Sequence, residues 1–223
     1  MALTDFLRDV GNDSALLLGG LRSTLLLATT ISITGFVGGV LVFFCTLTSN
    51  RIGRYWVESY ISFFIGTPLL VLLFLMYYGL PQWGVRLSPL WVSIIGFTLN
   101  VAAYNARYLT TAYRGLDTGE LEAARAQGFT SWQVFTLITL PQVLRLSIPG
   151  LTNQVILNLK DSSIAFLIQY TEFFAQIQEL SARNFKFFQA YLFAGIVYLG
   201  LVSVIVLIAR HLEAKCMIPG VRG

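Results

Sequence analysis

Long apolar runs separated by short polar loops make up most of this chain. Apolar stretches of about 20 residues are long enough to cross a bilayer as α-helices. The pattern therefore predicts an all-α membrane protein with five transmembrane helices. The predicted spans lie at about residues 21–47, 55–80, 90–113, from 146 onward, and 188–209.

The first 20 residues differ from these runs, because apolar and charged residues alternate there at helical spacing. An amphipathic helix of this kind lies along the membrane surface with its apolar face toward the lipid. We therefore interpret residues 1–20 as an interfacial segment at the start of a single transmembrane domain that covers residues 1–223. The apolar positions are Leu3, Phe6, Leu7 and Val10.

Glycine and proline mark two places inside the predicted spans. Gly35 and Gly39 lie four residues apart in the first span, a spacing that lets a second helix approach closely. Gly66, Thr67 and Pro68 interrupt the second span, and proline lacks the N–H group that a helix needs. We expect close packing at the first place and a loosened backbone ladder at the second.

The longest polar interval of the chain, residues 117–141, separates the third span from the fourth. Asp117 can accept hydrogen bonds from the free N–H groups at the start of a short helix. Gly128 is free to take a positive φ and so to end that helix. Thr130 and Gln133 have the spacing of a capping box, which predicts a second helix. The interval is thus predicted to form a compact helix-turn-helix.

The same interval resembles the Glu-Ala-Ala loop of the permease subunits of bacterial ABC importers. The resemblance rests on Glu122-Ala123-Ala124, on Gly128, and on an Ile-Thr-Leu-Pro ending at Pro141, into which the second helix runs. In that family the loop forms a coupling helix that sits in a cleft of the cytoplasmic ATPase subunit. The resemblance therefore implies an ATPase-coupling role for these five residues. The alternative is a solvated amphipathic connector between two spans.

The composition supports a membrane location. Of the 223 residues, 56% are hydrophobic and 12% are charged, and the mean hydropathy is +0.70. This length leaves room for one bundle of spans and for no separate soluble domain. The net charge of +4 comes mostly from arginine, and membrane topology explains it better than a nucleic-acid partner does. The two cysteines do not indicate a disulfide framework.

The distribution of basic residues predicts the orientation of the chain. With the N-terminus outside, nine Lys and Arg residues fall on the inner side and six on the outer side. Cytoplasmic loops of membrane proteins carry the excess of Lys and Arg. We therefore expect Met1 outside and Gly223 inside the bacterial cytoplasmic membrane, which places Glu122 in the cytoplasm. The nine inner residues are Arg51, Arg54, Arg107, Arg114, Arg125, Arg145, Arg210, Lys215 and Arg222.

The chain lacks the residue pattern of a catalytic centre. Its one histidine, His211, is at the inner end of the last span, where an interfacial side chain is the simplest interpretation. No Gly-Lys pair is present, so the sequence has no phosphate-binding loop of the Walker type. We therefore expect no enzyme activity, no metal site and no cofactor on this chain. ATP and Mg²⁺ are expected on a separate ATPase subunit.

Other motifs narrow the resemblance to the polar amino-acid branch of these permeases. The run from Leu159 to Ile164, Leu-Lys-Asp-Ser-Ser-Ile, is similar to a Leu-Lys-Asp-Thr-Ser-Leu run of that branch, and the Gly-Thr-Pro interruption matches its second span. Polar and charged side chains are costly in a bilayer unless they serve a pathway or pair with one another. The substrate pathway is therefore predicted to include Gly66, Thr67, Pro68, Asn105, Arg107, Asn158, Asp161 and Ser162.

Two positions depart from the usual pattern of that branch. Ile65 stands where Arg usually precedes Gly-Thr-Pro, and Arg107 stands where Glu is usual. Arg107 can bind an anionic group of the substrate, or its side chain can extend toward the inner membrane interface. Alternatively, the change can mean that this subunit has lost its own binding site. Asp161 can receive an ammonium group of the substrate, or it can pair with Lys160 or Arg107. The sequence leaves these alternatives open.

The resemblance implies a permease subunit with the fold of type I ABC importers, which moves polar amino acids or related compounds across the membrane. Its expected partners are a second permease subunit (itself or a homologue), two ATP-binding subunits inside, a substrate-binding protein outside, and membrane lipid. No nucleic-acid partner is expected. A small channel or secondary carrier is the alternative, although it leaves the helix-turn-helix unexplained and no internal repeat is evident. A purely structural subunit would require the polar cluster near Asp161 to serve packing only.

Overall fold

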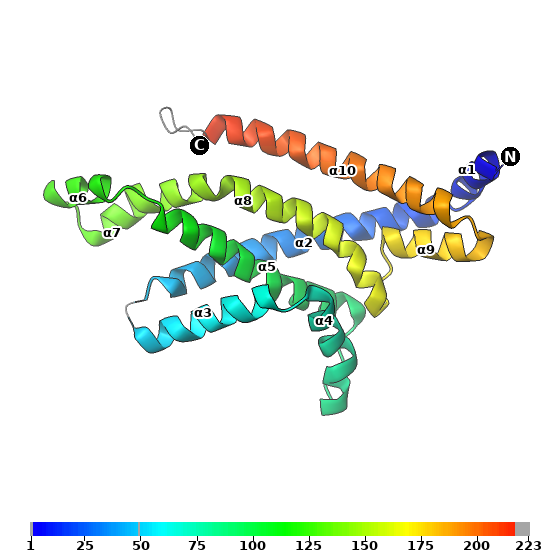
Figure 1. Cartoon of the computed structure of the whole chain (residues 1–223), viewed down its shortest axis with the longest axis horizontal. Helices are drawn as coiled ribbons and strands as arrows, with labels where there is room; N and C mark the ends of the chain where they lie inside the picture. The colour runs from blue at the N-terminus through cyan, green and yellow to red at the C-terminus, as the bar shows by residue number, and fades with distance from the viewer. Residues whose placement is uncertain (1, 49, 217–223) are drawn as a thin grey trace.

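The computed structural model describes residues 2–48 and 50–216, and the regular secondary structure of these residues is entirely helical. Figure 1 shows the long helices lying along the longest axis, with α1 and α9 at one end and α6 and α7 at the other. The α-helices are α1 (Ala2–Asn12), α2 (Ser14–Thr46), α3 (Arg51–Gly66), α4 (Leu69–Phe74), α5 (Pro89–Arg114), α6 (Thr118–Ala126), α7 (Ser131–Gln133), α8 (Leu140–Asp161), α9 (Phe173–Asn184) and α10 (Phe187–Cys216). Two π-helical segments, η1 (Leu75–Gly79) and η3 (Val134–Thr139), and two 3₁₀ segments, η2 (Leu80–Trp83) and η4 (Ser162–Ile168), complete the set.

The contact between α2 and α5 is the most extensive of the helix pairs. Gly35 and Gly39 of α2 face α5 at this contact. A Cβ atom on Gly39 would lie 2.5 Å from the Cβ of Asn105, and one on Gly35 would overlap the side chain of Val101. Only the hydrogen side chain of glycine fits such spacing. The predicted close packing at these two glycines is confirmed.

Three helical stretches among the described residues are long and apolar enough to cross a membrane: Ser14–Thr46, Ser131–Ile168 and Phe187–His211. The broken pair Arg51–Gly66 and Leu69–Trp83 would make a fourth. α5 is 26 residues long and more polar, because its buried face carries hydroxyl and amide side chains. The count of five spans therefore stays a prediction, with α5 as the fifth. The buried polar residues of α5 are Ser93, Asn100, Asn105 and Thr110.

The second predicted span is broken at residues 66–68, where only a loosened ladder was expected. The helical stretches before and after the break meet at 100°. Pro68 has no N–H group, so the carbonyl oxygen of Phe64 loses the donor that an unbroken helix would provide. The side chain of Asn100 on α5 replaces that donor, with its Nδ2 atom 2.9 Å from the Phe64 oxygen. A hydrogen bond from the neighbouring helix thus stabilises the break.

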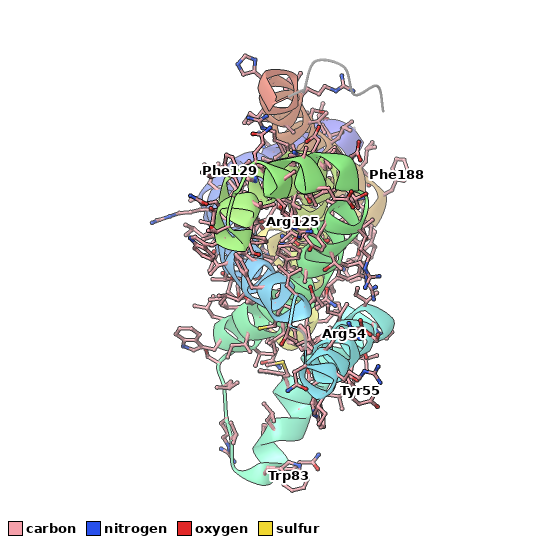
Figure 2. The ribbon with its side chains drawn as sticks, turned by 90° about the vertical axis from the view of Figure 1, so that its left-hand side faces the viewer. Arg54, Tyr55, Trp83, Arg125, Phe129 and Phe188 are labelled. Atoms are coloured by element: carbon pink, nitrogen blue, oxygen red, sulfur yellow. The ribbon has the colours of Figure 1, made fainter. Side chains whose placement is uncertain are left out.

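Beyond this break the chain leaves the bundle as an arm formed by α4, η1 and η2. Figure 2 shows the arm projecting from the other helices, with Trp83 at its tip. The side chain of Trp83 is 86% exposed, and Leu75 and Tyr78 on the same arm are more than half exposed. The arm therefore presents an apolar surface outside the bundle.

The helix that contains the fourth predicted span begins before that span, at Ser131. The second helix of the polar interval does not end at Pro141, because the helical stretch Ser131–Ile168 continues through it. In a regular α-helix the ring of Pro141 would clash with the carbonyl group of Leu137. The π-helical segment η3 comes directly before α8, and its wider turns give the proline ring room. The helix therefore continues through Pro141, while a start of the membrane-spanning part near residue 146 stays a prediction.

α1 packs against protein at the end of the molecule opposite α6 and α7. Phe6 is 1% exposed and lies in one apolar cluster with Ile177 of α9. The Nζ atom of Lys186 lies 2.8 Å from Oδ2 of Asp9, which ties α1 to the start of α10. The helix predicted within residues 1–20 is present, but α2 already begins within that segment. Protein, not lipid alone, therefore covers its apolar side.

Candidate functional site

The polar interval of residues 117–141, which we call the hairpin, begins with a helix whose two ends are closed by local hydrogen bonds. Oδ1 of Asp117 accepts a hydrogen bond of 2.8 Å from the N–H group of Gly119. At the other end of α6, Gly128 has a φ of +88°. The N–H group of Phe129 donates to the carbonyl oxygen of Ala124 at 3.2 Å, as in a Schellman motif. Both predicted end signals are confirmed.

The second half of the hairpin starts with the predicted capping box. The Thr130 hydroxyl accepts from the Gln133 N–H group at 3.3 Å, and Oε1 of Gln133 accepts from the Thr130 N–H group at 2.9 Å. One side-chain contact then ties α6 to α8, because Nε2 of Gln142 donates to Oε2 of Glu120 at 2.7 Å. These bonds give a short hairpin a defined shape without a large core.

The hairpin turns most of its side chains away from the rest of the chain. In Figure 2 the hairpin faces the viewer, with Arg125 and Phe129 on it. Glu122 is exposed, and its carboxylate makes no hydrogen bond or ion pair with the residues that the structure describes. Trp132 is 72% exposed and Leu137 is 63% exposed. Exposed apolar side chains beside an unpaired carboxylate are typical of a surface that another protein covers.

A cavity of about 230 Å³ lies between α2, α5 and α8. It brings together two of the predicted pathway residues, Asn105 and Asn158, although they are 53 positions apart in the chain. We call it the amide cavity, because three carboxamide side chains line it and none of its lining residues is charged. The lining residues are Ser32, Phe36, Asn105, Ile148, Leu151, Thr152, Gln154, Val155 and Asn158.

A chain of hydrogen bonds crosses the wall of the amide cavity. Nε2 of Gln154 donates to Oδ1 of Asn158 at 3.0 Å, and Nδ2 of Asn158 donates to the Ser32 hydroxyl oxygen at 3.0 Å. Oε1 of Gln154 and Oδ1 of Asn105 are buried without a hydrogen-bond partner in the described structure. Buried polar atoms normally have partners, so each of these two oxygens can still accept a hydrogen bond.

The other predicted pathway residues do not join this cavity. Arg107 is exposed and lines a small separate hollow near Glu58 and Arg114, toward the end of α5 that leads into the hairpin. Asp161 is half-buried at the opposite end of α8 and forms no ion pair with Arg107 or Lys160. The role of Asp161 therefore stays a prediction.

Ser162 and residues 66–68 hold structural positions in this fold. Ser162 is fully buried, and its hydroxyl donates to the carbonyl oxygen of Leu159 at 2.7 Å. That bond closes the end of α8, where the helix tightens into η4. Gly66, Thr67 and Pro68 form the break between α3 and α4 described above. Their part in a pathway stays a prediction.

The sequence pattern did not point to Glu172, which is completely buried. Its Oε1 accepts from the N–H group of Ala175 at 2.7 Å and so caps α9. Its Oε2 accepts from the Thr24 hydroxyl at 2.9 Å and from the Tyr198 hydroxyl at 3.2 Å. We call Glu172, Thr24 and Tyr198 the Glu172 cluster. The cluster joins α2, α9 and α10, and burial raises the pKa of the Glu172 carboxyl above its usual range.

Comparison with known proteins shows which family has this architecture. A family model described as the binding-protein-dependent transport system inner membrane component matches residues 35–217. The chain belongs to this family. It is 39% identical over 185 residues to a probable amino-acid permease protein, YxeN, of Bacillus subtilis, covering 82% of this chain and 83% of that one. It is also 39% identical over 161 residues to a probable amino-acid ABC transporter permease protein, PatM, of Vibrio harveyi, covering 71% and 72% of the two chains.

Solved structures agree with the family. An amino acid ABC transporter solved with histidines superposes with a TM-score of 0.88 at 26% identity, covering 92% of this chain and 96% of that one. The methionine transporter MetNI superposes with a TM-score of 0.73 at 20% identity, which supports the fold. This chain is thus an inner-membrane transport subunit with the type I ABC importer permease fold. Members of this family are transport subunits, not enzymes. Nothing in these comparisons supports the alternative of a channel or secondary carrier.

Proposed function

We propose that this permease moves polar amino acids or closely related compounds across the cytoplasmic membrane as one transmembrane domain. The amide cavity is the observation that carries the proposal, because it places three carboxamides and two unpartnered oxygens among otherwise apolar helices. A binding site for a small polar molecule needs a few such groups in an apolar wall. The amino-acid permeases among the relatives named above support the same substrate class.

The hairpin is proposed to couple this subunit to a cytoplasmic ATPase subunit. Glu122, Ala123, Ala124, Gly128 and Pro141 form or flank its exposed end, and all but Ala124 are exposed. Ala124 is 7% exposed, on a helix that packs against η3 in the second half of the hairpin. The ATPase subunit would then bind ATP and Mg²⁺ and hydrolyse the ATP, and this chain would bind neither.

We propose that the hairpin faces the cytoplasm, and this determines the orientation of the whole chain in the membrane. α1 and the hairpin lie at opposite ends of the molecule, so the N-terminal helix would then face outside and the end of α10 inside. Met1 and Gly223 themselves lie outside the described residues. The full assembly would contain two permease subunits (two copies of this chain or this chain with a homologue), two ATPase subunits and an extracytoplasmic substrate-binding protein.

The substrate pathway would run through the amide cavity. Asp161 would lie on one side of the cavity along this path and Arg107 on the other. Asp161 lies at the end of α8 away from the hairpin, and Arg107 lies near the hairpin end of α5. We keep Gly66, Thr67, Pro68 and Ser162 as parts of the proposed path, where they shape the backbone rather than contact substrate.

Reconstitution tests this function. The permease, its ATPase subunits and its binding protein would be placed in proteoliposomes, and the uptake of radiolabelled amino acids would be measured with and without ATP. We expect ATP-dependent accumulation of at least one polar amino acid. Uptake that proceeds without ATP, or uptake restricted to sugars or inorganic ions, would contradict the proposal.

A further inference from the structure

The amide cavity offers no charged group to a ligand. None of the residues that line it is Asp, Glu, Lys, Arg or His. A charged side chain inside it would lose its water without gaining an opposite charge, which is strongly unfavourable. The cavity is therefore suited to an uncharged polar group.

The directions of the hydrogen bonds determine what Gln154 offers. The Ser32 hydroxyl lies 2.7 Å from the carbonyl oxygen of Ala28 and donates its single proton there. The Ser32 oxygen therefore accepts from Nδ2 of Asn158, and Oδ1 of Asn158 is left to accept from Nε2 of Gln154. This order leaves Oε1 of Gln154 as a buried acceptor without a donor. Gln154 is only 5% exposed, so bulk water does not satisfy it.

Asn105 complements Gln154 from the facing helix. Its side chain is 3% exposed and makes no hydrogen bond in the described structure, and its Oδ1 is the other unpartnered buried oxygen. No partner fixes its carboxamide, so rotation by 180° can present either the oxygen or the NH₂ group. Asn105 can thus donate to and accept from one ligand group, while Gln154 accepts.

We propose that the amide cavity binds the carboxamide side chain of the transported amino acid, so that this permease selects glutamine- or asparagine-like substrates. This inference rests on the proposed function. A ligand carboxamide supplies an NH₂ group to Oε1 of Gln154 and pairs with the adaptable carboxamide of Asn105. The volume of about 230 Å³ has room for this side chain, and the charged ammonium and carboxylate groups of the amino acid stay outside the cavity.

Measuring ligand binding to the permease itself tests this inference, because the selectivity of the substrate-binding protein then does not contribute. The complex of permease and ATPase subunits would be purified in detergent without the binding protein, and the binding of radiolabelled L-glutamine would be measured. L-Glutamate has the same shape and a charged side chain, so we expect it to compete about a hundredfold less well than L-glutamine. L-Glutamate and L-glutamine competing equally would overturn the inference.

Two variants of Gln154 and one control sharpen the test. Gln154→Met keeps the length and removes the acceptor, so glutamine affinity should fall about tenfold. Gln154→Glu adds a carboxylate and should improve L-arginine over L-glutamine by about tenfold. Asn153→Met is the matched control, because Asn153 is the next residue on α8, is exposed, and does not line this cavity. Glutamine affinity that is unchanged in Gln154→Met would overturn the inference.

The outcomes separate this inference from the proposed function. A wild-type complex that transports another amino acid but binds neither glutamine nor asparagine overturns only the choice of a carboxamide. A reconstituted importer that transports no amino acid of any kind overturns the proposed function and this inference with it. Glutamine binding that weakens in Gln154→Met and not in Asn153→Met supports both.

Discussion

The hairpin and the Glu172 cluster use hydrogen bonds for opposite purposes. The caps of the hairpin join residues two to five positions apart and leave its outer surface exposed. The bond between Thr24 and Glu172 spans 148 positions and is completely buried. Local hydrogen bonds thus fix the ends of the short helices in the hairpin, whereas the Glu172 cluster holds three helices of the fold together.

This difference predicts which substitutions alter stability and which alter coupling. A change in the Glu172 cluster leaves buried groups without partners, so it should destabilise the chain. A side chain substituted at the exposed end of the hairpin contacts solvent or the ATPase subunit. Such a substitution should therefore reduce transport more than it reduces stability.

Glu172→Ala should destabilise the permease by about 2–4 kcal/mol. The substitution removes the cap of α9 and leaves the Thr24 and Tyr198 hydroxyls without their acceptor. Thermal unfolding of the detergent-solubilised protein would measure the loss. Glu172→Gln keeps an acceptor for the cap and serves as the control, with a smaller effect. Equal melting temperatures for Glu172→Ala and wild type would show that the cluster does not hold the fold.

Gly128→Val should abolish most ATP-driven uptake and cost only about 1–2 kcal/mol of stability. A β-branched residue is strained at the φ of +88° found there, although the space around it is open. Uptake and ATP hydrolysis would be measured together in proteoliposomes. Gly115→Ala is the matched control, since Gly115 lies in the preceding loop at a φ of −89°. Normal substrate-stimulated hydrolysis and uptake in Gly128→Val would rule out coupling through this turn.

The Glu172 cluster should also make stability depend on pH. Burial raises the pKa of Glu172 above its ordinary value of 4.5, so the fold favours the neutral carboxyl. The stabilisation is therefore complete below pH 4.5 and is lost as the pH rises through the higher pKa of the folded state. Melting temperatures between pH 5 and 8 should fall in wild type and fall less in Glu172→Gln. Parallel curves for the two proteins would assign the pH dependence to other groups.

Asp161 and Arg107 should have the smallest effects, confined to the ranking of substrates. Both are predicted to face the pathway, at levels that the structure places far from one another along the bundle. Asp161→Asn should weaken the transport of ligands with a cationic head group a few-fold, and Arg107→Glu should shift the preference toward basic substrates. Competition assays at matched protein levels would measure both. An unchanged ranking in both variants would leave Arg107 and Asp161 as structural residues.

The sequence was sufficient for the hairpin and for the family because their signals are local. Asp117, Gly128 and the Thr130–Gln133 box each depend on neighbours within a few residues, and each was confirmed. The glycine pair in α2 was also readable, since small residues at this spacing have one common use. The family motifs are likewise short runs, at residues 66–68, 122–141 and 159–164.

Features that depend on distant partners could not be read from the sequence. Glu172 is an isolated acidic residue whose distant partners lie in α2 and α10, and the only available signal was a carboxylate directly before two phenylalanines. The passage of the helix through Pro141 depends on a π-helical segment that has no clear sequence signal. The amide cavity joins residues of α2, α5 and α8, and Gln154 was not among the predicted pathway residues because only the fold shows that its oxygen lacks a partner.

Cysteine accessibility on the two ends of the molecule tests the central claim most directly. Asn12 and Arg125 are exposed at opposite ends and would each be replaced by cysteine in a chain otherwise free of cysteine. In sealed right-side-out vesicles, an impermeant thiol reagent should label position 12, and position 125 should react only after the membrane is opened. Bound ATPase subunits should then protect position 125 and leave position 12 unchanged. Labelling of position 12 from the cytoplasmic side alone, or no protection of position 125 by the ATPase, would contradict the account.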